Sequence, residues 1–241
     1  KEITFDRAWQ YKTIISFMCK KLFGAYRLWL DIDGNVYDPR DGGNFSLKYF
    51  AKNIPIMLDL VIESLKKQNK NSISILVIGP GAGLDILAAF YKAKKEGFDV
   101  HIDAIEVNHF ATENSQYNFK RHFGKKTGAN DTINIVTVEE GKEFDKLNEK
   151  QYDFITATEV VEHLHDPGKE LDRLWTCLKP GGRLGIMTKL VMDKKAFASW
   201  HYKRDLTHVC FFSKTTFKWL AELFRAEITF AEKDVIIFYK I

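Results

Sequence analysis

The stretch Ser74-Ile-Leu-Val-Ile-Gly-Pro-Gly-Ala-Gly-Leu-Asp85 decides the fold. Its first part, Ile75–Ile78, is a short apolar run stopped by glycine, which is typical of a strand buried on both faces. Three glycines then follow at alternate positions: Gly79, Gly81 and Gly83. From Leu84 to Lys95 apolar residues recur at helical spacing. Strand, glycine loop and helix in this order predict the place where an α/β protein holds an adenosine-containing ligand. Taken alone, the loop also fits a simple tight turn.

Length and composition describe an ordinary globular chain. The 241 residues are 45% hydrophobic, which is enough for one large domain or for a domain with a cap. No apolar run reaches the roughly 20 residues of a membrane span, so we expect no membrane partner. The net charge of +4 permits an anionic substrate without indicating one. No block of Lys and Arg interleaved with aromatic residues marks a nucleic-acid surface, so nucleic acid is not the expected partner.

The cysteines and the first residues bear on location. Cys19, Cys177 and Cys210 are widely spaced and form no Cys-x-x-Cys pair. This argues against a disulfide scaffold or a zinc site and favours a reducing, cytoplasmic location. The opening residues are charged and mixed, so we expect no signal peptide, and Lys1 indicates a trimmed sequence.

The chain divides into an N-terminal extension or cap, residues 1–70, and a Rossmann-like domain, residues 71–241. In the first part we expect a helix over 5–23, a hairpin from 26–30 and 36–37, and a helix over 46–67 interrupted near Pro55. This part either covers a substrate pocket or packs on the sheet. In the second part strands are expected at 100–105, 133–138, 152–157, 183–188, 228–232 and 235–239. Helices are expected at 84–95, 110–123, 170–178 and 215–224, with one more directly after the strand at 152–157.

This alternation predicts an α/β fold, a doubly wound and mostly parallel sheet covered on both faces and closed by an antiparallel hairpin. Two ligands suit this architecture, a nicotinamide or flavin dinucleotide and S-adenosylmethionine, and the glycine loop discriminates between them. A dinucleotide site needs Gly-x-Gly-x-x-Gly/Ala, but the third position is occupied by Leu84 or Ile86, depending on the starting glycine. Asp85 would also repel a phosphate at the start of the helix. Glu106 ends the next strand, where a carboxylate accepts ribose hydroxyls.

Four stretches in order resemble the motifs of class I S-adenosylmethionine-dependent methyltransferases. They are Ile78-Gly-Pro-Gly-Ala-Gly83, Ala104-Ile-Glu-Val-Asn108, Tyr152-Asp-Phe-Ile-Thr-Ala-Thr-Glu-Val-Val-Glu-His-Leu164 and Leu178-Lys-Pro-Gly-Gly-Arg-Leu-Gly-Ile-Met-Thr188. The resemblance covers residues 73–241 and implies seven strands in the order 3-2-1-4-5-7-6, the last one antiparallel. It implies S-adenosylmethionine as cofactor. The implied contacts are Gly79, Pro80, Gly81 and Gly83 in the loop, Glu106 at the ribose, Glu139 or Glu140 near the adenine, and Thr158 and Glu159 near the reactive methyl.

A second cluster predicts where the methyl acceptor binds. Glu159, Glu162 and His163 stand at i, i+3 and i+4, which on a helix share one face. Two carboxylates and an imidazole can hold a divalent cation, such as Mg²⁺ on the oxygens or Mn²⁺ or Fe²⁺ with the imidazole. His208 lies in the loop after the fifth strand, which returns over the same edge of the sheet.

These segments resemble the Glu-x-x-Glu-His…His arrangement of metal-dependent O-methyltransferases, including those of small-RNA 3′-end 2′-O-methylation and of ubiquinone biosynthesis. The resemblance implies Glu159, Glu162, His163 and His208 as catalytic residues and metal ligands. The alternative is a metal-free enzyme in which His163 contacts the substrate or packs.

The first hypothesis is therefore in-line transfer of the methyl group to a hydroxyl of a small molecule. The alternatives are an RNA 2′-O-methyltransferase and a non-catalytic ligand-binding protein on the same fold. A base N-methyltransferase is disfavoured, because Thr156-Ala-Thr-Glu159 replaces the Asn/Asp-Pro-Pro-Tyr/Phe motif. Five aromatic residues near His208 either line an apolar pocket or form core beneath a loop: Phe197, Trp200, Tyr202, Phe211 and Phe212.

Overall fold

The computed structural model describes residues 53–241 apart from 82, 126, 140–146 and 148, together with the backbone of two short strands, β1 (Trp29–Leu30) and β2 (Val36–Tyr37). β1 and β2 pair antiparallel, which confirms the hairpin predicted there. The helix predicted over 5–23, the first part of the one predicted over 46–67, and Glu140 lie outside the described residues.

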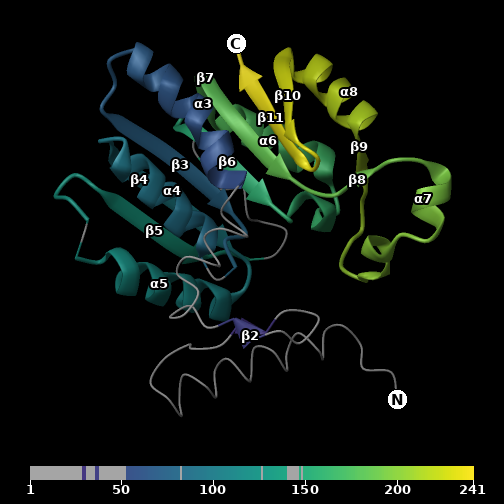
Figure 1. The fold of residues 1–241 in the computed structure, drawn as a ribbon, viewed down its shortest axis with the longest axis horizontal. Coiled ribbons are helices and arrows are strands. Elements are labelled where there is room, and N and C mark those ends of the chain that lie inside the picture. The colour runs from purple at the N-terminus through teal and green to yellow at the C-terminus, as the bar shows by residue number, and fades with distance from the viewer. Residues whose placement is uncertain are drawn as a thin grey trace.

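A seven-stranded sheet forms the middle layer (Figure 1). Its strands are β3 (Ser72–Ile78), β4 (Asp99–Glu106), β5 (Thr132–Thr137), β6 (Tyr152–Thr158), β7 (Leu178–Met187), β10 (Ala226–Glu232) and β11 (Val235–Lys240). They lie in the order β5-β4-β3-β6-β7-β11-β10, and β11 alone runs opposite to the other six strands. Counted along the chain, this is the order 3-2-1-4-5-7-6 that the resemblance implied, so the predicted fold class is confirmed.

Helices cover both faces of the sheet. They are α3 (Asn53–Lys67), α4 (Leu84–Lys95), α5 (His109–Phe123), α6 (Pro167–Cys177) and α8 (Lys214–Phe224), whereas the short α7 (Lys194–Ala198) buries no residue and lies apart from the sheet. Side chains of β3 alternate between two cores, as a pleated strand requires. Ile75 and Val77 pack with residues of α3, α4 and α5, whereas Leu76 and Ile78 pack with residues of α6 and α8. The helices expected at 84–95, 110–123 and 215–224 are all present.

Helix α3 is part of the main core. Ile54, Met57 and Leu58 are fully buried, and the helix contacts α4, β6 and β7. Pro55 lies in the first turn, where its missing N–H costs no hydrogen bond, so it does not interrupt the described helix. The boundary between a cap of residues 1–70 and a domain of 71–241 stays a prediction. Among the described helices, none combines the length and apolar character needed to cross a lipid bilayer.

The helix expected directly after β6 is wrong. The chain there forms one 3₁₀ turn, η1 (Val161–His163). Glu159 has φ +53°, in the left-handed region, so a right-handed helix cannot run through it. The carbonyl of Glu162 is also taken by the N–H groups of Val209 and Cys210, at 2.8 and 3.1 Å. A segment distant in sequence therefore replaces the next helical turn.

That segment, residues 190–213, is called the strap below. Its ends pair as the parallel strands β8 (Leu190–Val191) and β9 (Phe212–Ser213), and it contains α7 and the 3₁₀ turn η2 (His201–Arg204). In Figure 1 it projects, in light green, beyond the end of the sheet. A correction also applies to β7, which begins at Leu178 rather than at Arg183.

The burial of α3 generates a prediction. Leu58→Ala should lower the free energy of unfolding by about 2–5 kcal/mol, because it leaves a cavity between α3 and the sheet. Glu63→Ala, on the exposed side of the same helix, should leave it nearly unchanged. Urea denaturation of the two variants measures the difference. Equal stabilities would contradict the assignment of α3 to the core.

Candidate functional site

The glycine loop needs glycine at each predicted position. Gly79, Gly81 and Gly83 all have positive φ, at +59°, +53° and +83°. A Cβ on Gly79 would lie 2.8 Å from the Val160 side chain, and one on Gly83 would lie 3.0 Å from the Ser115 backbone. At Gly81, by contrast, no described atom lies within 4 Å of such a Cβ. The loop is thus packed at its two ends and open in its middle.

Glu106 lies beside this open part of the loop. Its Oε2 accepts the Gly81 N–H at 3.0 Å, and its Oε1 accepts the Asn108 N–H at 3.0 Å. Burial raises the pKa of this carboxyl, which is 8% exposed, and the backbone donors offset that effect in part. Each oxygen keeps a second lone pair, so the fixed carboxylate can still accept ligand hydroxyls.

The other predicted cofactor contacts lie along the same edge of the sheet. The Val138 N–H donates to the Glu106 carbonyl at 2.9 Å, which brings the exposed Glu139 to the end of β5 next to β4. Thr158 ends β6, and the Glu159 N–H donates to the Met187 carbonyl at 2.8 Å.

Asp85 is a second buried carboxylate at the loop, and sequence reasoning did not assign it a binding role. It lies in the first turn of α4 and is 7% exposed. Burial raises the pKa of its carboxyl to about 6, and the nearby Thr158 hydroxyl lowers it in part. The signal in the sequence was an acidic residue directly after the glycines, which served there only to argue against a phosphate.

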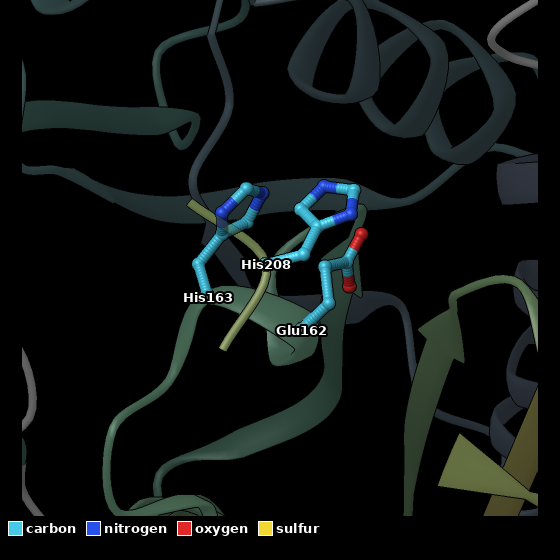
Figure 2. A group of neighbouring side chains, drawn as sticks. All are labelled: Glu162, His163 and His208. Atoms are coloured by element: carbon cyan, nitrogen blue, oxygen red, sulfur yellow. The ribbon is translucent and has the colours of Figure 1, made fainter. Parts of the chain in front are cut away.

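Glu162, His163 and His208 converge beyond the end of β6. One potential ligand atom from each lies within 4.8 Å of the others. Figure 2 shows the three side chains next to one another. Glu162 is fully buried, and its Oε2 has no hydrogen-bond partner among the described residues. A buried carboxylate oxygen without a donor is costly, so this position is suited to a cation.

The two histidines are held in matching tautomers. Nδ1 of His163 lies 3.0 Å from the Thr207 carbonyl, and Nδ1 of His208 lies 2.8 Å from the Tyr202 carbonyl. A carbonyl only accepts, so each Nδ1 donates its proton there, and each Nε2 is the ring nitrogen left for another partner. Burial and the neighbouring His208 lower the pKa of His163, which favours the neutral ligand form. Asp205 Oδ2 lies 3.7 Å from His208 Nε2 and adds negative charge.

Glu159 is connected to this cluster through Tyr202 and not through a shared helix face. Its Oε2 accepts a hydrogen bond from the Tyr202 hydroxyl at 2.8 Å, and the same hydroxyl bonds Glu162 Oε1. Burial and the negative charge of Glu162 hold the pKa of Glu159 well above its usual range. Tyr202 therefore links the two carboxylates that the sequence placed on one helix face.

The aromatic residues of the strap are divided between two environments. Phe212 is buried in the second core and stacks on Phe217 at 5.2 Å. The other four contact one another at ring distances of 5.1 to 6.5 Å: Phe197, Trp200, Tyr202 and Phe211. The Tyr202 ring also lies 4.1 Å from the His208 ring. The aromatic cluster thus packs within the strap and supports His208 and Tyr202.

Comparison with known proteins identifies a family and several relatives. Residues 49–228 match the protein family described as a methyltransferase domain. Over 149 residues the chain is 29% identical to a ubiquinone biosynthesis O-methyltransferase of Rickettsia bellii. The matched stretch makes up 59% of this chain and 53% of that protein. Over 162 residues it is 22% identical to the mitochondrial ubiquinone biosynthesis O-methyltransferase of Dictyostelium discoideum. This match makes up 66% of this chain and 49% of that protein. The chain thus spans about half the length of the curated relatives it matches.

The fold is similar to that of solved methyltransferase structures. A methyltransferase from Aquifex aeolicus, described as dependent on S-adenosylmethionine, shares 18% sequence identity and a TM-score of 0.50, covering 84% of this chain and 97% of that one. At this identity the similarity concerns the fold alone.

The double contact of Tyr202 generates a prediction. Tyr202→Phe keeps the ring beside His208 but removes the hydroxyl that hydrogen-bonds the buried Glu162 and the partly buried Glu159, so both carboxyl groups lose their shared partner. At mildly alkaline pH the free energy of unfolding should fall by about 1–3 kcal/mol. Tyr91→Phe, which removes a hydroxyl from a side chain that is 54% exposed, should have no such effect. If chemical denaturation finds both variants as stable as the wild type, the two carboxylates do not depend on Tyr202.

Proposed function

The chain belongs to the methyltransferase-domain family, and on this basis we propose that it transfers the methyl group of S-adenosylmethionine to a hydroxyl of a small molecule. The convergence of Glu162, His163 and His208 directly after the strand that ends in Thr158 carries the proposal. It sets a polar, acceptor-rich cluster next to the predicted site of the reactive methyl. The names of the two relatives as O-methyltransferases support a hydroxyl acceptor.

On the cofactor side, the chain supplies shape and hydrogen-bond acceptors. The open middle of the glycine loop lets the ligand approach the backbone. Glu106 is held by two backbone N–H groups and accepts the ribose hydroxyls, with Glu139 near the adenine. Thr158 and Glu159 flank the reactive methyl. Since a sulfonium is already an activated donor, the remaining task is to orient the acceptor and to remove its proton.

In a reaction without a metal, Glu159 is suited to accept that proton. It is partly buried next to Glu162, and its raised pKa makes it a stronger base than an exposed glutamate. Tyr202 fixes its carboxylate through a hydrogen bond of 2.8 Å. Once Glu159 has taken the proton, the acceptor oxygen attacks the methyl carbon from the side opposite the sulfur, and adenosylhomocysteine leaves as a neutral thioether.

The donor set also fits a divalent metal. Glu162 offers an oxygen without a partner among the described residues, and His163 and His208 offer their Nε2 atoms, with Glu159 as the further predicted ligand. Two imidazoles with carboxylates favour Mn²⁺ or Fe²⁺ over Mg²⁺, which prefers oxygen. When bound there, the metal would lower the pKa of the attacking hydroxyl and orient a neighbouring one.

Calorimetry and turnover test the cofactor and the reaction together. Wild-type protein should bind S-adenosylmethionine, and labelled methyl should pass to a small aromatic compound with neighbouring hydroxyls rather than to a short RNA. Glu106→Gln should weaken cofactor binding about tenfold or more, because it removes the charged acceptor for the ribose. Glu222→Gln, on the exposed side of α8, is the matched control. No binding at millimolar cofactor would rule out the enzyme, and transfer to RNA alone would overturn the small-molecule acceptor.

Metal titration tests the second part of the proposal. After chelation, Mn²⁺ should bind the wild type and restore turnover, and Glu162→Gln and His208→Ala should each weaken Mn²⁺ binding by about 100-fold. His201→Ala removes an exposed histidine of the same strap and should change neither quantity. Binding should weaken as the pH falls, because protons compete for both Nε2 atoms. Equal turnover with and without chelator would instead favour the metal-free reading, with His163 as a substrate contact.

A further inference from the structure

Two buried carboxylates flank the glycine loop, and their surroundings differ. Glu106 accepts one backbone N–H on each oxygen. Asp85 accepts none from the described backbone, and no described Lys, Arg or His forms an ion pair with it. Only the Thr158 hydroxyl lies close enough to favour its charged form. One carboxylate is thus already solvated by the protein, and the other is not.

The sheet places these carboxylates on opposite sides of the loop. β3 lies between β4 and β6, with Ile78 opposite Ile105 on one side and Ala157 on the other. Glu106 ends β4, and Asp85 approaches Thr158 at the end of β6. A ligand lying across the loop therefore meets Glu106 at one end and Asp85 at the other.

A buried carboxylate that lacks donors is stabilised most by a cation that is itself a donor. The adenosine end of S-adenosylmethionine offers neutral hydroxyls, which suit Glu106. The methionyl end carries two positive charges, an α-ammonium and a sulfonium, and only the ammonium has N–H groups. We infer that Asp85 binds the α-ammonium group of the methionyl part of the cofactor. This inference rests on the proposed function. It adds Asp85 as a cofactor-binding residue that selects for the positive charge of the α-ammonium group.

A ligand series on two proteins tests the inference. Binding is measured by calorimetry on wild type and Asp85→Asn, with S-adenosylmethionine, adenosylhomocysteine, an analogue of adenosylhomocysteine that lacks the amino group, and methylthioadenosine. Asp85→Asn should weaken the first two ligands alike, by about 10- to 100-fold, which corresponds to the loss of one charged hydrogen bond. It should leave the analogue and methylthioadenosine unchanged. Asp172→Asn, an exposed acidic residue of α6, should change no affinity.

The wild type alone also tests the inference, should Asp85→Asn not fold. The analogue without the amino group should bind the wild type at least about tenfold more weakly than adenosylhomocysteine. Equal affinities of these two ligands for the wild type, or unchanged adenosylhomocysteine binding by Asp85→Asn, would overturn the role of Asp85. A loss confined to S-adenosylmethionine would assign Asp85 to the sulfonium and overturn the ammonium assignment. A wild type that binds none of the four ligands would overturn the proposed function itself.

Discussion

The parallel pairing of β3 between β4 and β6 is the constraint on which the candidate site depends. Because all three strands run in one direction, their carboxyl ends meet at one edge of the sheet. That edge brings together the glycine loop, Glu106 and Thr158, which come from three separate parts of the chain. The left-handed glycines then allow the chain to leave β3 and enter α4 without filling the space above the loop. A side chain at Gly79 or Gly83 would meet Val160 or Ser115 instead.

A second constraint assembles the acceptor side. The carbonyl of Glu162 accepts two N–H groups of the strap, and the Thr207 carbonyl accepts from His163. These bonds fix the strap against η1 and bring His208 next to His163, with ring centres 4.7 Å apart. Tyr202 completes the arrangement, because its ring and carbonyl contact His208 while its hydroxyl contacts Glu159 and Glu162. The Tyr202 hydroxyl lies between the carboxyl groups of Glu159 and Glu162, which allows them to lie close together here.

Much of this could be predicted from the sequence, and the failures have physical reasons. Periodicity located α4 and most strands, because burial imposes a regular pattern on them. The helix expected after β6 failed, because the left-handed Glu159 and hydrogen bonds from the strap replaced helical ones, which no local pattern reports. Tyr202 was seen only as one of five aromatic residues, since a sequence cannot show which hydroxyl reaches a carboxylate. The separation into a cap and a domain, and the roles of the individual site residues, stay predictions.

The sequence by itself determined the alternation of strands and helices along the chain, the glycine loop and the identity of the residues at its rim. Those features depend on local chemistry: glycine adopts positive φ angles without the steric cost of a Cβ, and an apolar strand that ends in Glu106 delivers a carboxylate to the edge. Only the tertiary structure decided which of two buried carboxylates is already satisfied by backbone donors, and that Glu162, His163 and His208 converge. Both depend on contacts between segments far apart in sequence, where hydrogen bonding and burial, rather than residue type, set the state of each side chain.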